Sequence, residues 1–138
     1  MFNASRYLTL VRISAVYDLL VTAPFMTPWS AALYLGSFAT LSEALGLARP
    51  IPVLGAAEML FANLLGSLVA VWAVWRLRHT SLAAGRYDAA ARGVFTLWQL
   101  YAVGAGASVL LLGFTLMEVA FGVLQAWPVR AAQGAARR

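Results

Sequence analysis

The stretch from residue 55 to residue 78 constrains the fold more than any other part of the chain. It reads GAAEMLFANLLGSLVAVWAVWRLR, with a single carboxylate, Glu58, near its start and two arginines, Arg76 and Arg78, at its end. A helix needs about 20 mainly apolar residues to cross the hydrocarbon core of a bilayer, and flanking arginines are typical of the ends of such helices. This stretch therefore predicts a membrane-spanning helix.

The composition of the whole chain agrees with a membrane protein. Of its 138 residues, 62% are hydrophobic and 11% are charged, whereas soluble domains have about 25% charged residues. This length accommodates four crossings at most, so we expect a single membrane domain over residues 1–138. The arginines lie beside apolar segments, which favours topology signals at anionic lipid headgroups over a nucleic-acid-binding surface.

The residue types present restrict the cofactors. The chain has no cysteine, which excludes disulfides, thiolate metal sites and iron–sulfur clusters within it. Its one histidine, His79, cannot supply the two axial ligands of a b-type haem. No metal-ligand spacing or nucleotide-binding motif is present. No metal site and no cofactor are predicted, although the sequence is compatible with a quinone or a lipid.

Prolines and glycines divide the apolar sequence into segments. We expect an all-α bundle of four transmembrane helices at residues 7–25, 54–76, 86–103 and 108–127, followed by a basic tail at 128–138. The last two helices are separated at Gly104-Ala105-Gly106, because the apolar region around this turn is too long for one crossing. Residues 29–47 are predicted to form an additional interfacial or re-entrant helix between the first two.

The arginine distribution decides whether residues 29–47 span the membrane. If they do and the last apolar region is one helix, the arginines divide almost evenly between the two sides. If they do not, only Arg49 falls on one side, Arg12 lies within the first helix, and the others share the opposite side. Those others are Arg6, Arg76, Arg78, Arg86, Arg92, Arg130, Arg137 and Arg138. The positive-inside rule favours the second arrangement, which predicts a multi-pass bacterial inner-membrane protein with cytoplasmic N- and C-termini.

Several polar side chains fall inside the predicted helices. They are Arg12, Asp18, Glu58, Asn63, Gln99 and Glu118. A charge at the bilayer centre costs about 2.5–3.5 kcal/mol, so these groups should turn inward and pair. The predicted depths bring Arg12 within reach of Glu118, of Asp18, or of both. Two interpretations stay open: a polar ligand-binding pocket with Arg12 and Glu118 at its floor, or a structural ion pair that fixes helix register.

Small residues recur along the second predicted span. Ala62, Gly66 and Ala70 are spaced four residues apart, so they lie on one face of a helix. A face without bulky side chains allows another helix to approach closely. We expect this face to pack within the bundle or against a partner protein.

The arrangement of the chain resembles the DoxX-like group of small bacterial membrane proteins. The resemblance rests on Arg12 in the first helix, the proline-rich exit at Pro24 and Pro28, an outer-face segment, and the pattern of Gly55, Glu58 and Gly66. It covers most of the chain and implies a four-helix inner-membrane bundle. Some members of that group are linked to quinone-coupled sulfur oxidation or to oxidative-stress complexes. Asp18, Asn63 and Glu118 match no pattern of the group.

The sequence supports two classes of function. The first is a non-catalytic bundle that acts as an accessory subunit or binds a small lipophilic ligand in the polar pocket. Its expected partners are membrane lipids, and another membrane protein or a second copy of the chain. The second is an enzyme acting on a lipid or a quinone, with Asp18 or Glu58 as general acid or base and Arg12 stabilising negative charge. The sequence does not decide whether the chain is an enzyme.

Overall fold

The computed structural model describes residues 2–47, 49 and 51–129, and within this part of the chain all regular secondary structure is helical, with no strand. Five α-helices and one 3-10 turn follow one another in it. They are α1 (Ala4–Thr22), the 3-10 turn η1 (Ala23–Met26), α2 (Pro28–Ala44), α3 (Ala56–Arg78), α4 (Leu82–Gly104) and α5 (Leu111–Ala126). The all-α prediction is confirmed for these residues. The predicted tail at 128–138 lies outside them, apart from Pro128 and Val129.

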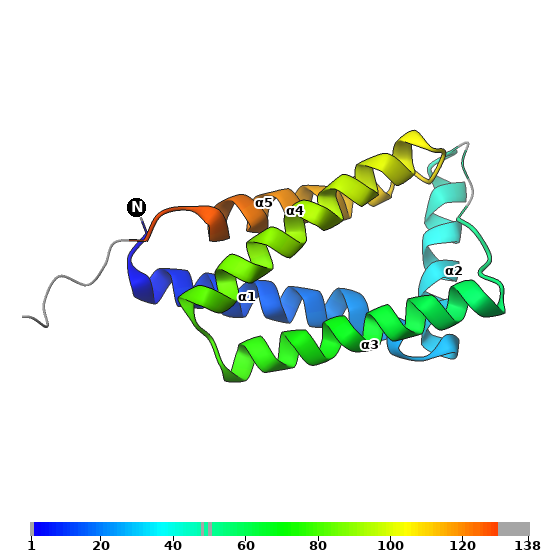
Figure 1. Ribbon diagram of the computed structural model, residues 1–138. Coiled ribbons are helices and arrows are strands. Elements are labelled where there is room, and N and C mark those ends of the chain that lie inside the picture. The colour runs from blue at the N-terminus through cyan, green and yellow to red at the C-terminus, as the bar shows by residue number, and fades with distance from the viewer. Residues whose placement is uncertain (1, 48, 50, 130–138) are drawn as a thin grey trace, which may run out of the picture.

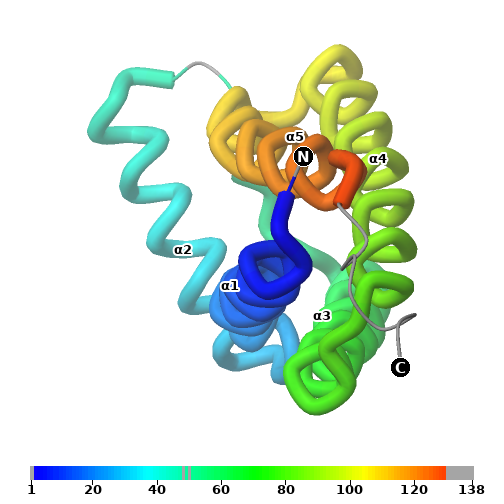
Figure 2. The backbone as a smooth tube through the Cα atoms, turned by 90° about the vertical axis from the view of Figure 1, so that its left-hand side faces the viewer, coloured from blue at the N-terminus to red at the C-terminus, as the bar shows by residue number. Residues whose placement is uncertain are grey.

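Four of the helices form two packed pairs. α1 packs against α3, and α4 packs against α5. The two pairs run along the length of the bundle, and α2 crosses one end of it (Figures 1 and 2). The first and last described residues meet at the opposite end, where the Phe2 amide donates to the Pro128 carbonyl at 3.1 Å. α3 and α4 diverge from their short connector at residues 79–81 (Figure 1).

A row of aromatic rings holds α2 across the end of the bundle. Phe25 of η1 contacts Tyr34, Tyr34 contacts Phe38, and Phe38 reaches Phe114 of α5. The ring centroids are 4.9–5.5 Å apart, within the range at which aromatic pairs add to apolar burial. α2 is therefore fastened to both helix pairs, and it lies transverse to them.

Side-chain caps explain where the helices begin. The side chains of Asn3, Thr27 and Ser81 accept hydrogen bonds from backbone amides in the first turns of α1, α2 and α4. Such caps satisfy amides that have no partner within the helix. The Ser81 cap starts α4 at Leu82, whereas the sequence predicted a start at residue 86. Residues 82–85 therefore belong to the helix and not to the connector.

The turn predicted at Gly104-Ala105-Gly106 is present between α4 and α5. Gly106 has a φ of 113°, a backbone conformation that residues with a side chain rarely adopt. The Ala107 amide donates to the Ala102 carbonyl at 2.8 Å, which closes the end of α4. The chain reverses within a few residues, and α5 packs back along α4 (Figure 1).

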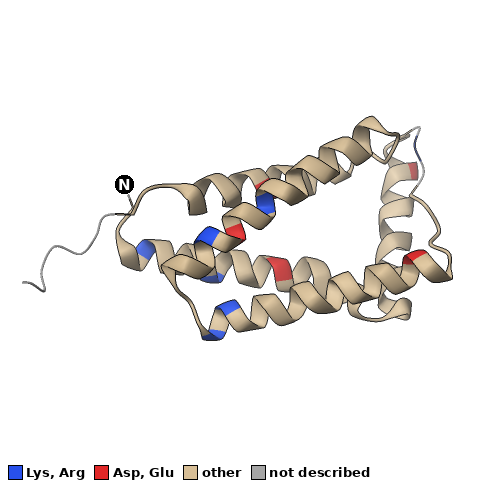
Figure 3. Cartoon of the chain, in the orientation of Figure 1, with Lys and Arg blue, Asp and Glu red and all other residues tan. Residues whose placement is uncertain are grey.

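The outer surface of the bundle is apolar. Along α3, large hydrophobic side chains point outward. They are Leu60, Phe61, Leu64, Leu65, Leu68 and Val71. Two segments, Ala4–Met26 and Ala56–Arg78, are long and apolar enough to cross a membrane, and α5 is apolar but shorter. Charged residues are few, and the middle of α3 and the second half of α4 carry none (Figure 3).

Two glycines allow close helix contacts. A Cβ atom at Gly85 of α4 would lie 2.6 Å from the Tyr7 hydroxyl and 2.7 Å from Val11 Cγ2 of α1. A Cβ atom at Gly66 of α3 would lie 2.5 Å from Phe25 Cβ. Both distances are shorter than van der Waals contact, so only glycine fits these crossings.

The crossing at Gly85 gives a stability prediction. Gly85→Ala should lower the free energy of unfolding by about 1–3 kcal/mol, because α1 must move away from α4. Gly93→Ala on the same helix, where an added Cβ meets nothing within 4 Å, is the matched control and should be neutral or slightly stabilising. Reversible chemical unfolding in detergent measures both. Equal stability of the two variants would contradict this packing.

Candidate functional site

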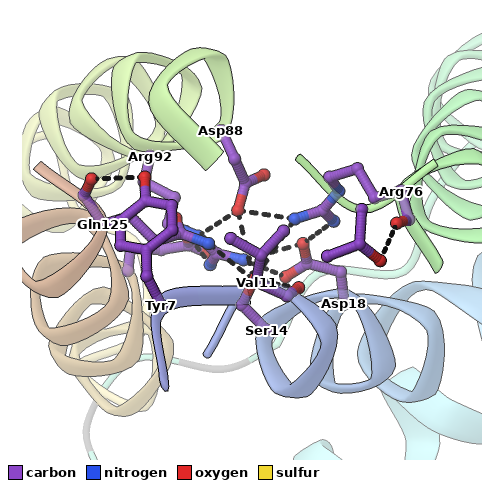
Figure 4. Close-up of polar contacts among 10 residues, drawn as sticks. Tyr7, Val11, Ser14, Asp18, Arg76, Asp88, Arg92 and Gln125 are labelled. Carbon is purple, nitrogen blue, oxygen red and sulfur yellow. Dashed lines mark hydrogen bonds and ion pairs between the residues drawn. The ribbon is translucent and has the colours of Figure 1, made fainter. Parts of the chain in front are cut away.

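Five charged side chains from four helices meet inside the bundle. Asp18 comes from α1, Arg76 from α3, Asp88 and Arg92 from α4, and Glu118 from α5. All five residues are buried. Figure 4 shows their side chains converging between the helices, with the exception of Glu118, which the figure does not label. We refer to these five residues as the charge cluster.

Arg92 lies at the centre of the charge cluster. Its Nε donates to Asp88 Oδ2 at 3.1 Å and its Nη1 donates to Glu118 Oε2 at 2.8 Å. Its Nη2 donates to both carboxylate oxygens of Asp18, at 2.8 and 2.7 Å. All three guanidinium nitrogens are thus engaged with carboxylates. The planar fork of arginine suits such simultaneous contacts, and this one side chain joins α4 to both α1 and α5.

Arg76 is the second cation of the charge cluster. Its Nη2 donates to Asp18, and its Nη1 lies 2.5 Å from Asp88 Oδ2. The Arg76 guanidinium lies 5.7 Å from the centre of the Trp72 ring, close enough for a cation–π interaction. Arg76 therefore connects α3 to α1 and α4, so each helix of the two packed pairs contributes a charge.

Neutral polar groups extend the charge cluster toward the chain termini. Ser14 donates to Asp88 Oδ2 at 3.3 Å and accepts from Gln125 Nε2 at 2.7 Å. The Tyr7 hydroxyl donates to the backbone carbonyl of Gln125 at 2.7 Å. These contacts tie α1 to α5 over a distance of more than 100 residues in sequence (Figure 4). Polar contacts thus link the cluster to the end that carries both termini.

The predicted pairing of Arg12 with Glu118 or Asp18 is wrong. Arg12 is exposed, and its Nε donates to Thr80 Oγ1 at 3.2 Å. The buried face of α1 carries Val11, Ser14 and Asp18, which follow helical spacing. Arg12 falls one position off this face, about 100° around the helix. Arg92 and Arg76 supply the positive charges in its place.

A cavity of about 540 Å³ adjoins the charge cluster. Asp18, Asp88, Arg92 and Glu118 form part of its lining, and most of the remaining lining is apolar. Its aromatic lining residues are Tyr17, Phe25, Tyr34, Phe38, Trp72, Phe95, Trp98 and Phe114. The exposed residues in the lining, Leu65, Phe95 and Trp98, all belong to α3 and α4. The open side of the cavity therefore lies between these two diverging helices.

The other predicted site residues divide between the cavity and the rest of the fold. Gln99 lines the cavity together with Asp18 and Glu118. Glu58 is exposed in the first turn of α3, where a negative charge stabilises the helix dipole. Asn63 donates to the Phe25 carbonyl at 2.8 Å, so it secures the turn after α1. The structure thus brings together three of the six predicted residues.

The small-residue face of α3 packs inside the bundle. Ala62 and Gly66 line the cavity, Gly66 also contacts η1, and Ala70 is buried. η1 and α1 cover the face between Gly66 and Ala70, as α3 packs closely against both. This face therefore lies against the chain's own helices.

Sequence reasoning missed Arg76, Asp88 and Arg92 as members of the site. Arg76 and Arg92 were interpreted as topology signals outside the bilayer. For Asp88 and Arg92 a signal was available, because both lie within the helix predicted at residues 86–103, and the Ser81 cap places them still farther from its start. Ser14, Tyr7 and Gln125 carried no sequence signal of this role.

Burial raises the pKa of the Tyr34 phenol on α2 above its usual value, so this cavity-lining hydroxyl stays protonated at neutral pH. Among residues 2–47, 49 and 51–129, no group of three or more histidine or acidic side chains has a metal-binding arrangement. In the charge cluster, the guanidinium groups occupy the places between the carboxylates.

Comparisons with protein-family models, with curated proteins and with solved structures found no match to this chain. The resemblance to the DoxX-like group therefore stays a prediction.

The charge cluster gives a second stability prediction. Arg92→Met should lower the free energy of unfolding by about 3–5 kcal/mol, because it leaves three buried carboxylates without their shared partner. Arg12→Met, which removes an exposed arginine from α1, is the control and should change stability by less than about 0.5 kcal/mol. Unfolding in detergent compares the two variants. A small effect of Arg92→Met would show that the cluster does not hold the bundle together.

Proposed function

We propose that this chain is an integral protein of the bacterial inner membrane that binds a small lipophilic ligand in the cavity between α3 and α4. In this proposal α1, α3, α4 and α5 span the bilayer. α2 lies in the interface across one end of the bundle.

The distribution of polarity supports a membrane environment. The outer face of α3 consists of large apolar side chains, while the charge cluster is buried among the helices. A water-soluble protein has the opposite arrangement. In a bilayer, charged side chains turn toward the bundle interior and pair with one another. α4 carries three charges in its first half, Arg86, Asp88 and Arg92, and two of them belong to the cluster.

The exposed arginines support the proposed orientation. Arg6, Arg12, Arg78 and Arg86 are exposed on α1, α3 and α4. They lie toward the end where Phe2 meets Pro128, and Arg12 bonds to Thr80 in the connector at that end. Arg49 lies near the α2 end, where it donates to the Val103 carbonyl at 2.8 Å. When the buried Arg76 and Arg92 are left out, the exposed arginines of the helices still lie toward this end and only Arg49 lies near the other. The positive-inside rule therefore supports a cytoplasmic location for the end where Phe2 meets Pro128.

The cavity is the observation that carries the ligand proposal. Its volume of about 540 Å³ falls in the range of about 300–1,000 Å³ typical of small-molecule sites. It combines a mostly apolar wall with a few polar groups at one end, which is also typical of such sites. Its open side lies between two helices that would face lipid, so a lipophilic molecule can enter from the bilayer without crossing water.

Binding is favoured over the two other functions that the sequence left open. An accessory subunit needs a surface for its partner, and the small-residue face of α3 is covered by η1 and α1. An enzyme using Asp18 as general acid or base needs a carboxylate that exchanges protons freely. Asp18 instead accepts hydrogen bonds from both Arg76 and Arg92, so both of its carboxylate oxygens are already engaged.

A photoreactive ligand tests the proposal. The full chain in nanodiscs of zwitterionic lipid is labelled with a dodecyl alcohol carrying a diazirine, and labelled peptides are mapped by mass spectrometry. Saturable labelling is expected on α3 and α4 within the cavity. Ala91→Phe, which fills the cavity from α4, should reduce it at least about tenfold, equivalent to about 1.4 kcal/mol of binding free energy.

Ala90→Phe is the matched control for this experiment. Ala90 is the exposed neighbour of Ala91 and does not line the cavity, so the same substitution should leave labelling unchanged. Labelling that is equally reduced by both variants, or by neither, would contradict a ligand site in the cavity.

A further inference from the structure

We propose that the ligand of this cavity carries a cationic headgroup, and that it is a lipophilic amine held against the carboxylates of the charge cluster. This inference rests on the proposed binding function and names the chemical class of ligand for the same cavity. It follows from the sign and the accessibility of the charges at the polar end.

The charge cluster contains more negative than positive groups. Asp18, Asp88 and Glu118 are paired with only two arginines, Arg76 and Arg92. The cluster therefore has one acidic side chain more than it has arginines, and Glu118 is the carboxylate that contacts only one of them. An uncompensated charge is costly in a medium of low dielectric constant. A cation placed in the cavity beside the cluster would offset it.

Two of the three carboxylates, those of Asp18 and Glu118, are more accessible than the guanidinium groups of the cluster. The side chains of Asp18 and Glu118 are each 11% exposed, whereas those of Arg76 and Arg92 are 0% and 2% exposed. The three nitrogens of the Arg92 guanidinium already donate to Asp88, Glu118 and Asp18. Glu118 accepts from Arg92 through Oε2 alone among the described residues, so Oε1 is left to accept from a ligand.

A second, separate group in the cavity also requires a donor. Gln99 Oε1 is buried and has no hydrogen-bond partner in the described part of the chain, and Gln99 lines the same cavity. It lies seven residues after Arg92 on α4, on the same helix face and about 10 Å farther along the axis. A buried acceptor without a hydrogen bond costs folding free energy. A ligand that donates a hydrogen bond would satisfy Gln99 Oε1.

The wall of the cavity suits the same ligand class. An ammonium group offers three donors and no acceptor, which matches carboxylate oxygens. Aromatic faces attract ammonium groups, and Trp72, Phe95 and Trp98 line the cavity. A ligand with a carboxylate head would bring a further negative charge to a cluster that already has an excess of one. The site therefore selects an amine over a fatty acid.

Three photoreactive probes with the same dodecyl chain test this inference, and they differ only in an amine, an alcohol or a carboxylate head. Each labels the full chain in nanodiscs of zwitterionic lipid. Labelling that persists in Ala91→Phe is subtracted, which removes the effect of each probe's partition into the bilayer. We expect the amine to label the cavity at least about tenfold more strongly than the carboxylate, which corresponds to about 1.4 kcal/mol.

Glu118→Gln tests the origin of this preference. The substitution removes the excess negative charge but keeps an oxygen that can accept from Arg92, so it should abolish the preference for the amine while the alcohol still binds. If this variant does not fold, the comparison of headgroups in the wild-type chain decides the question. Ala102→Phe, at another lining position on α4, serves as a second, independent variant in which the cavity is blocked.

The outcomes separate this inference from the function on which it rests. Equal labelling by the three probes, blocked by Ala91→Phe, would overturn the amine assignment and leave a site for lipophilic ligands of any head. Stronger labelling by the carboxylate, or a preference for the amine that survives Glu118→Gln, would also overturn it. If Ala91→Phe does not block the labelling by any of the three probes, both proposals are overturned.

Discussion

The buried guanidinium of Arg92 is the interaction on which the rest of the structure depends. It bonds to carboxylates from α1, α4 and α5 at 2.7–3.1 Å, and Arg76 adds α3 to the same cluster. In an apolar environment, separating any of these helices would expose a charge without a partner, at a cost of several kcal/mol. In the proposed bilayer setting the hydrophobic effect cannot hold the helices together, because lipid chains are as apolar as the side chains they would replace. A central charge cluster, with close packing at Gly66 and Gly85, supplies the cohesion.

The same cluster also explains the shape of the cavity. It joins the two helix pairs near the connector of α3 and α4, and beyond it these helices diverge toward α2 (Figure 1). The aromatic row from Phe25 to Phe114 keeps α2 at the far end. The space between these two fastenings is the cavity of about 540 Å³. Its polar end and its apolar wall are thus consequences of how the bundle is held together, and a ligand in it would contact the residues that stabilise the fold.

The sequence predicts the helices of this fold more successfully than its side-chain contacts. α3 follows from a continuous apolar run, and the reversal between α4 and α5 follows from glycines whose backbone freedom the turn requires. Pairing depends instead on the rotation of each helix about its axis, which single-sequence reasoning does not determine. Arg12 and Asp18 are both inside α1, yet only Asp18 shares the buried face with Val11 and Ser14. The treatment of Arg92 had the larger consequence, because the prediction counted it with the arginines outside the bilayer, whereas it lies at the centre of the bundle.

A double-mutant cycle between Asp18→Asn and Arg92→Gln tests the central claim most directly. The two residues lie on α1 and α4, and their side chains are hydrogen-bonded directly to each other within the charge cluster. Unfolding free energies of the wild-type chain, the two single variants and the double variant are measured in the same detergent. Residues in one buried network should show a coupling energy above about 1 kcal/mol, whereas independent sites add within about 0.5 kcal/mol. Strong coupling is the result that this account predicts, and simple additivity would contradict it.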